Sequence, residues 1–303
     1  MPGFPIHVLV VSDIEGSSLC RRYEDSVFLD KGWPAACLGM TLDVQAVVSA
    51  LFRSGVRKVT VKDFHRTAYN LLPEKIDPRA RVVQGYKSGP VPGIGDPRNA
   101  DAVMFLGMHA ASGTGGFLAH TLTSRIANLK VNGRPLSEVE LFSASLARYH
   151  LHPLFLSGCP IACRQAEDAI HGIRTFPISK PNDNGGFDAR SWRRKLAEAV
   201  AAALSNKRVR PYQPAGPFAV CVTLREGPVV AKKIAARWQL DRKGADLIFK
   251  AADAAELYRT LIRICYFTPF LERIISVGLP LFNLKGRLGL TWVRRRLRQQ
   301  PLG

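Results

Sequence analysis

Two carboxylates stand one residue apart at the end of the first apolar segment of the sequence. Asp13 and Glu15 follow the run IHVLVVS at 6–12, which has the composition of a buried β-strand. Side chains two residues apart on a strand point to the same face, so the two negative charges would lie side by side. Such a pair costs free energy unless a cation lies between or beside the carboxylates. The candidate cations are Arg, Lys and a metal ion.

Residues of the types that bind metals also end two further predicted strands. The run 57–63 ends in Asp63, with His65 two residues further on, and the run 101–107 ends just before His109. Parallel strands of an open α/β sheet place their carboxyl ends at one rim, where such sheets usually carry their sites. Carboxylates mixed with imidazoles suit Zn²⁺, Mn²⁺ or Co²⁺. Together these strand ends predict a metal site, although each residue alone could be a turn cap, a surface histidine or a core imidazole.

The elements that must position these residues alternate between strand and helix. A helix is predicted at 41–54, where apolar residues share one face and Gly55 supplies a stop. The Asn132-Gly133 pair predicts a hairpin over 126–137, and Ser137 can cap the helix that follows. Further strands are expected at 81–85, 152–158 and 173–179, and further helices at 138–149, 161–171 and 187–204. This alternation predicts an α/β fold with a mostly parallel sheet flanked by helices.

A proline-containing break at 210–217 divides the predicted elements into two groups. Residues 1–209 form a larger α/β domain that carries the metal site. Residues 218–268 form a smaller C-terminal α/β subdomain, with strands at 218–224 and 245–250 and helices at 228–238 and 252–267. The remaining residues, 270–303, are a basic, partly apolar tail. Its glycines weaken any helix, so we expect the tail to be partly ordered and solvated.

The composition is that of a globular protein with a strong excess of positive charge. The 303 residues include 47% hydrophobic residues and carry a formal net charge of +19. Basic chains associate with nucleic acid, anionic membranes or acidic partners, and the tail is the segment best suited to such a contact. No RNP, zinc-finger or helix-turn-helix signature accompanies the charge, and a generally basic protein background explains it equally well.

Other features of the sequence indicate an intracellular protein. The six cysteines lack zinc-finger spacing, so we expect reduced, mostly buried thiols. No apolar run predicts a membrane-spanning helix, and the N-terminus does not have the pattern of a signal peptide. These observations lead us to expect a cytoplasmic location.

Five short motifs resemble those of the M55 family of metallopeptidases, the D-aminopeptidase family. They are SDIEG at 12–16, KDFH at 62–65, FLGMHA at 105–110, AHTL at 119–122 and NGRPLSEVEL at 132–141. Their order and rough spacing match the family from about residue 7 to about residue 268. Phe64 and Phe142 are bulkier than the family pattern at their positions. Glu140, two residues from Glu138, would face elsewhere on a helix, so we retain Glu138 as the family's helix ligand.

The resemblance implies a hydrolase with two zinc ions per chain, for which Mn²⁺ and Co²⁺ are alternatives. The implied metal ligands are Asp13, Glu15, His65, His109 and Glu138, and the implied catalytic residue is His120. It also implies a ring-shaped homo-oligomer that acts on short peptides. A pair of metal ions would explain the adjacent carboxylates of the first motif.

The expected reaction is hydrolysis of short peptides or aminoacyl amides, with a D-residue at the N-terminus, through attack by metal-bound hydroxide. His120 would stabilise the oxyanion or pass a proton to the leaving amine. Asp63 is expected either to orient His65 through its other ring nitrogen or to hold the adjacent loop. Two alternatives remain: a different metal-dependent amide or ester hydrolase on the same scaffold, and a basic anion-binding protein acting through its tail.

Overall fold

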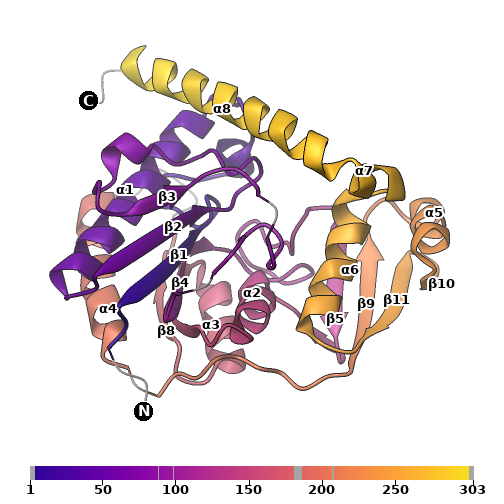
Figure 1. Cartoon of the computed structure of the whole chain (residues 1–303). Helices are drawn as coiled ribbons and strands as arrows, with labels where there is room; N and C mark the ends of the chain where they lie inside the picture. Colours follow the sequence, from indigo (N-terminus) through magenta and orange to yellow (C-terminus); the bar gives the residue numbers. More distant parts are fainter. Residues whose placement is uncertain (1–3, 88, 98, 181–185, 207, 300–303) are drawn as a thin grey trace.

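Six parallel strands form the large sheet of the protein (Figure 1). The computed structural model describes residues 4–87, 89–97, 99–180, 186–206 and 208–299. The strand order is β3-β2-β1-β4-β7-β8, and every neighbouring pair is parallel. The strands are β1 (His7–Ser12), β2 (Lys58–Asp63), β3 (Arg81–Val83), β4 (Ala102–Met108), β7 (His152–Gly158) and β8 (Arg174–Pro177). The predicted α/β fold with a mostly parallel sheet is confirmed.

Helices cover both faces of this sheet. Helices α1 (Trp33–Arg53) and α4 (Ala189–Leu204) pack with Val8 and Val10 on one face. On the other face, α2 (Glu138–Ala147) and α3 (Pro160–Ala169) pack with Leu9 and Val11. Every residue of β1 is therefore buried, as expected for a central parallel strand.

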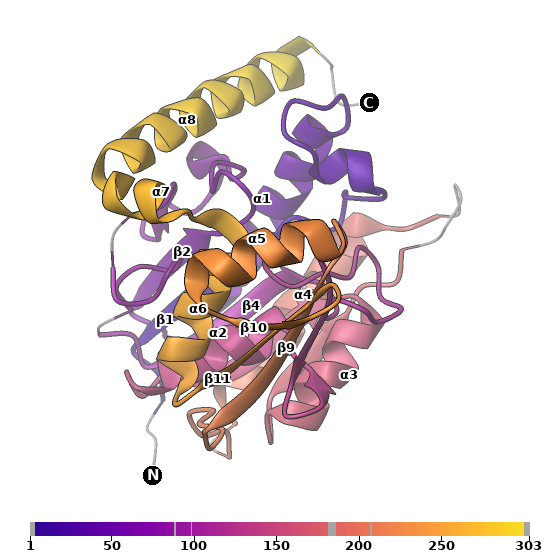
Figure 2. The same ribbon diagram turned by 90° about the vertical axis from the view of Figure 1, so that its right-hand side faces the viewer.

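A second, five-stranded sheet is antiparallel and has the order β10-β11-β9-β5-β6. Its strands are β5 (Ile126–Val131), β6 (Arg134–Pro135), β9 (Phe218–Leu224), β10 (Asp241–Lys243) and β11 (Asp246–Ala251). Helices α5 (Pro228–Trp238) and α6 (Ala254–Tyr266) pack against it (Figure 2). The predicted hairpin over 126–137 is present as β5 and β6, and it pairs with β9 rather than with the large sheet. The smaller sheet is thus built from both sides of the break at 210–217.

Among the described helices, α1 alone is long and apolar enough to cross a membrane, judged by length and composition only. Its most apolar window has a mean hydropathy of 1.6, but 67% of that window is buried inside the structure. This burial is typical of a core helix. The sequence predicted only its second half, at 41–54, and the helix in fact begins at Trp33.

The expectation of a partly ordered, solvated tail is wrong over the described residues. Helix α7 (Pro269–Arg273) is followed by α8 (Ile275–Gln299), which lies along the outside of the molecule (Figures 1 and 2). Its glycines allow close packing: a Cβ at Gly286 would lie 2.3 Å from the Tyr69 ring, and one at Gly289 would lie 2.3 Å from the Phe28 ring. Residues 300–303 of the predicted tail and residues 1–3 of the predicted first domain lie outside the described residues.

Candidate metal centre

The residues predicted to bind metal or to act in catalysis meet at one rim of the large sheet. Strands β1, β2 and β4 end at this rim, and helix α2 begins there. Five of the six side chains are buried, and His120 is half-buried. The six are Asp13, Glu15, His65, His109, His120 and Glu138. They form two groups of three, and within each group the candidate ligand atoms lie within 4.8 Å of one another.

Asp13, Glu15 and His65 form the first group. The Nδ1 atom of His65 lies 3.0 Å from Asp13 Oδ1 and 2.9 Å from Glu15 Oε2. Only the contact with Asp13 has hydrogen-bond geometry, and the buried Glu15 Oε2 has no hydrogen-bond partner among the described residues. The other ring nitrogen, Nε2, lies 2.8 Å from the Ser26 carbonyl oxygen, which can only accept a hydrogen bond. Nε2 therefore carries a proton, and Nδ1 is the nitrogen available to a metal ion.

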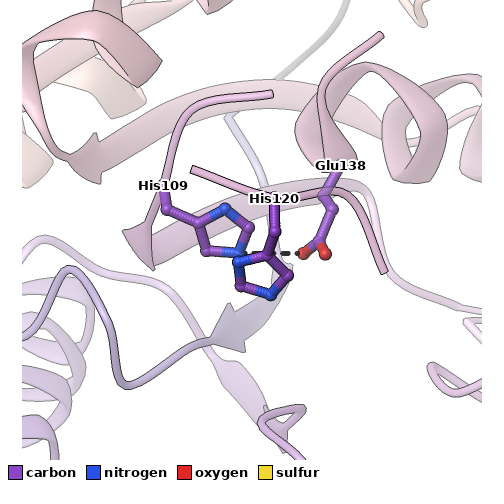
Figure 3. Close-up of side chains that lie close together, drawn as sticks. All are labelled: His109, His120 and Glu138. Carbon is purple, nitrogen blue, oxygen red and sulfur yellow. Dashed lines mark ion pairs between the residues drawn. The ribbon is translucent and has the colours of Figure 1, made fainter. Parts of the chain in front are cut away.

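His109, His120 and Glu138 form the second group, and Figure 3 shows the Glu138 carboxylate pointing toward the two imidazole rings. The Nε2 atom of His109 lies 3.6 Å from Glu138 Oε2. The rings of His109 and His120 stack with their centroids 3.8 Å apart. Both His109 Nε2 and Glu138 Oε2 are buried, and neither has a hydrogen-bond partner within the part of the chain that the structure describes.

Asp13 joins the two groups. Its Oδ1 atom faces His65, and its Oδ2 atom lies 3.4 Å from His109 Nε2. A carboxylate with each oxygen directed toward a different imidazole can contact two cations at once. Over the described residues, no Lys or Arg forms an ion pair with Asp13 or Glu15, and Lys180 donates its hydrogen bonds to the backbone carbonyls of Glu15 and Cys20. Of the three kinds of cation considered from the sequence, a metal ion fits this site.

The pKa values of the two buried histidines show how the metal-free site balances its charge. Burial alone lowers the pKa of His65, but Glu15 and Asp13 outweigh this effect and raise it to about 10. Burial likewise lowers the pKa of His109, while Glu138 and Asp13 raise it to about 10. Protons on the two rings therefore compensate the carboxylates, and a metal cation could replace those protons.

Glu138 and His120 have shifted pKa values for a different reason, which is burial. Burial raises the pKa of Glu138 to about 7, with Asp13 adding to the rise and His109 opposing it. Burial, together with the positive charge of His109, lowers the pKa of His120 to about 3. The His120 ring is thus neutral at neutral pH, and its Nδ1 lies 2.8 Å from the Leu118 carbonyl.

The residues present fit a zinc site. The donor set combines imidazoles and carboxylates, which zinc binds readily, and three of its buried atoms lack protein partners in the described chain. Hydrogen bonds from the surrounding backbone fix the donors. For example, the Leu122 N–H donates to Glu138 Oε1 at 2.6 Å, which turns Oε2 toward His109.

Among the described residues, Asp63 forms no hydrogen bond with the His65 ring. The Ser26 carbonyl lies 2.8 Å from His65 Nε2, in the position that was predicted for Asp63. The Asp63 carboxylate instead accepts hydrogen bonds from the backbone N–H groups of Asn70 and Leu71 and from the Asn70 side chain. Asn70 in turn donates to the His65 carbonyl at 2.7 Å. Of the two roles predicted for Asp63, the structure supports holding the loop that contains His65. Sequence reasoning missed Ser26 and Asn70.

Glu138 and Glu140 have separate environments on α2, as predicted. Ser137 caps the helix, and the Glu140 side chain accepts hydrogen bonds from the Ser137 N–H and hydroxyl at 3.0 and 2.8 Å. This reciprocal capping box keeps Glu140 away from the metal-type ligands. The bulky Phe142 is fully buried and packs against Phe64, with ring centroids 4.7 Å apart.

Comparisons with known proteins identify relatives of this chain. The profile of the M55 peptidase family, described as D-aminopeptidase, matches residues 6–262. A D-aminopeptidase of Bacillus subtilis (strain 168) is 29% identical over 211 residues, which cover 67% of this chain and 75% of the relative. A solved structure described as the Zn-dependent D-aminopeptidase DppA from Bacillus subtilis, a self-compartmentalizing protease, has the same fold. Its TM-score is 0.77 at 22% identity, and the match covers 85% of this chain and 96% of the other. Because the family profile matches most of the chain, this protein belongs to the M55 peptidase family and is a hydrolase.

Proposed function

We propose that the protein is an aminopeptidase that binds two zinc ions per chain and releases N-terminal D-residues from short peptides or aminoacyl amides. The observation that carries this proposal is the position of Asp13, whose two oxygens face histidines of two different ligand groups. The names of the relatives, D-aminopeptidase and Zn-dependent D-aminopeptidase, support the substrate class and the metal.

In this proposal, Asp13, Glu15 and His65 would hold one ion, and His109 and Glu138, together with Asp13, would hold the other. Zinc at these positions would lower the pKa of a shared water and polarise the scissile carbonyl. The protein's own part is to orient the ligands. Ser26 fixes the tautomer of His65, and Leu122 turns Glu138 toward His109.

His120 begins the reaction as a neutral imidazole and therefore has no proton on Nε2 to donate at the start. The Nδ1–H group of His120 donates a hydrogen bond to the Leu118 carbonyl, so Nε2 has a free lone pair. With its pKa lowered by burial, the ring is neutral when substrate binds. We propose that Nε2 takes a proton from the attacking water and then delivers it to the leaving amine.

We further propose that copies of the chain assemble into a ring with the active sites facing an inner chamber. The support is that the solved relative is described as a self-compartmentalizing protease. An enclosed chamber would admit short peptides and exclude folded proteins. Analytical ultracentrifugation and electron microscopy of the purified protein would measure the number and arrangement of subunits.

The test combines elemental analysis with a panel of D- and L-aminoacyl amides and the corresponding esters. We expect about two zinc ions per chain and hydrolysis of D-alanyl amides. The His109→Ala variant should lose metal and activity together. The His120→Ala variant should keep its metal and lose roughly 100-fold or more in kcat. Purified protein without bound metal or amidase activity would contradict the proposal, and cleavage of esters alone would favour a different hydrolase on the same scaffold.

A further inference from the structure

The outer face of α8 carries a row of exposed aliphatic side chains. Val277, Leu281, Leu284 and Leu288 are spaced by four, three and four residues, which aligns them along one side of the helix. They are between 51% and 65% exposed. Single exposed leucines are ordinary on protein surfaces, but a continuous row marks a surface that binds something apolar.

The row is distinct from the face by which α8 packs on the molecule. The packed face contains the buried residues Gly286, Gly289, Leu290 and Val293. It is held by polar contacts as well: the Asn283 side chain pairs with the backbone N–H and carbonyl of Tyr86 at 2.9 and 2.8 Å. Arg294 forms two hydrogen bonds of 2.9 Å with Glu74. The helix is thus fixed to the molecule by one face while its aliphatic row faces solvent.

Cations accompany the aliphatic row. Residues 270–303 contain seven Lys or Arg and a single acid, Glu272, which is already paired with Arg263 at 2.9 Å. Lys285 lies four residues after Leu281 and Arg295 lies seven after Leu288, so both exposed cations share the side of the row.

The basic surface continues around one flank of α8. A cavity of about 320 Å³ beside the helix is lined in part by Arg81, Lys87 and Arg287, and no acidic residue of the described chain lines it. The outside of α8 therefore offers both apolar and cationic groups to a partner.

The charge and the comparisons limit what this partner can be. A second copy that met this face with its own α8 would bring the same exposed cations, Lys285 and Arg295, against them, so like charges would repel at this face. The family profile ends at residue 262, which leaves α7 and α8 outside the matched region. Nucleic acid would pair with the cations but would leave the aliphatic row in water. The surface of an anionic bilayer satisfies both features, because apolar side chains enter the acyl boundary while Lys and Arg meet lipid phosphates.

We propose that α8 binds the surface of an anionic lipid bilayer through Val277, Leu281, Leu284 and Leu288, with Lys285 and the arginines near its C-terminus contacting headgroups. The helix lies in the plane of the interface and does not span the bilayer. Because α8 is already fixed to the large domain, binding brings the whole protein to the membrane without unfolding any element.

The test is co-sedimentation of the full-length, metal-loaded protein with vesicles. One set contains equal parts of phosphatidylcholine and phosphatidylglycerol, and the other contains phosphatidylcholine alone. We expect binding to the anionic vesicles and at least about tenfold weaker binding to the neutral ones. Changing Leu281, Leu284 and Leu288 together to Ser should weaken binding at least about tenfold.

The cations of α8 are tested in the same way. Changing Arg295, Arg296 and Arg298 of α8 together to Gln should weaken binding roughly fivefold per cation. Two matched controls use α5, another helix with exposed residues of the same types. The same change of Lys232, Lys233 and Arg237 on α5 should have a much smaller effect, and so should Val229→Ser, whose side chain is 68% exposed. Circular dichroism should show that every variant remains folded, and none of these residues belongs to the metal centre.

Several outcomes would overturn the proposal. They are failure of the wild-type protein to bind anionic vesicles, binding that the leucine changes leave intact, and an equal loss in the α5 controls. A fourth is a change in oligomeric mass on sedimentation of the leucine variant without vesicles, which would assign the row to a second copy. Vesicle binding is measured independently of hydrolysis, so this test can fail or succeed whatever the substrate.

Discussion

At the scale of single residues, Glu138 and Glu140 show how neighbouring carboxylates acquire different roles. We expect Glu138→Ala to lose at least one of about two bound zinc ions and most of the activity, because its Oε2 faces His109. Glu140→Ala should keep its zinc and lower the free energy of unfolding by about 1 kcal/mol, since it removes the capping box and the hydrogen bond with Tyr212, neither of which involves the metal-type ligands. Elemental analysis and urea unfolding measure the two effects. Loss of zinc in Glu140→Ala with retention in Glu138→Ala would reverse our assignment.

The raised pKa values of His65 and His109 predict how zinc binding depends on pH. Both are about 10 in the metal-free site, so both rings are protonated at neutral pH and zinc must displace those protons. Lowering the pH favours the protonated rings, and the apparent zinc affinity therefore falls. We expect a decrease of roughly tenfold per pH unit for each proton displaced. Competition with a chromophoric chelator between about pH 6 and pH 8 measures this slope, and an affinity independent of pH would contradict the assigned ligands.

The residues that the sequence could identify act through their side chains; most lie at strand ends, while His120 and Glu138 came from the resemblance to the family motifs. Asp13, His65 and His109 follow buried strands, and parallel strands bring their carboxyl ends to one rim. Ser26 could not be identified, because it acts through a backbone carbonyl that every residue possesses. The orienting role suggested for Asp63 failed for a related reason. The distance between a side chain and a ring depends on the path of the loop, which spacing alone does not determine.

At the scale of elements, the ends of β1 and β4 are held together by backbone hydrogen bonds that only glycine permits. Asp13 N–H donates to the Leu106 carbonyl at 2.8 Å, and Gly16 N–H donates to the Gly107 carbonyl at 2.7 Å. Gly107 has a φ of +74°, and a Cβ there would lie 2.0 Å from the Asp13 carbonyl oxygen. The glycine two residues before His109 thus lets the loops that carry Asp13 and His109 approach each other.

We therefore expect Gly107→Ala to be much more damaging than Gly133→Ala. Gly133 also has a positive φ, +80°, but a Cβ there would meet nothing within 4 Å. Gly133→Ala should cost about 1 kcal/mol from backbone strain alone. Gly107→Ala should cost roughly 3 kcal/mol or more and should also lower zinc content, because the clash displaces the Asp13 loop. Urea unfolding and metal analysis compare them, and equal effects would show that the close approach does not matter.

Helix α8 shows why element prediction failed in the tail. Its glycines reduce intrinsic helix propensity, and this effect was the basis for expecting a partly ordered segment. In the structure, Gly286 and Gly289 face Tyr69 and Phe28, so their lack of a side chain permits packing that offsets their poor propensity. The sequence pattern carries no information about which distant surface a glycine will approach. The N-terminal half of α1 was missed because its apolar residues lie all around the helix.

At the scale of the whole molecule, the two sheets share a continuous hydrophobic core. Leu9 and Phe105 of the large sheet belong to the same buried cluster as Val222 and Phe249 of the smaller sheet. The break at 210–217 suggested two successive units, because composition along the chain shows where a linker lies. It does not show that the hairpin of β5 and β6 crosses to the second sheet. That pairing joins residues about 90 positions apart and depends on the folded topology.

This shared core predicts that the chain does not divide into domains that fold alone. A fragment ending at residue 209 would lack β9, leaving the β5 edge without its partner and exposing Ile126 and Leu129. We expect this fragment to aggregate or to unfold without a cooperative transition.

A fragment ending at residue 268 keeps both sheets and loses only α7 and α8. It should unfold in one transition at lower urea concentration, because Tyr69, Phe28 and Trp33 lose the cover of α8. Circular dichroism and tryptophan fluorescence should report coincident transitions for the full chain. A cooperative, protease-resistant fragment 1–209 would instead establish the first 209 residues as an independent domain.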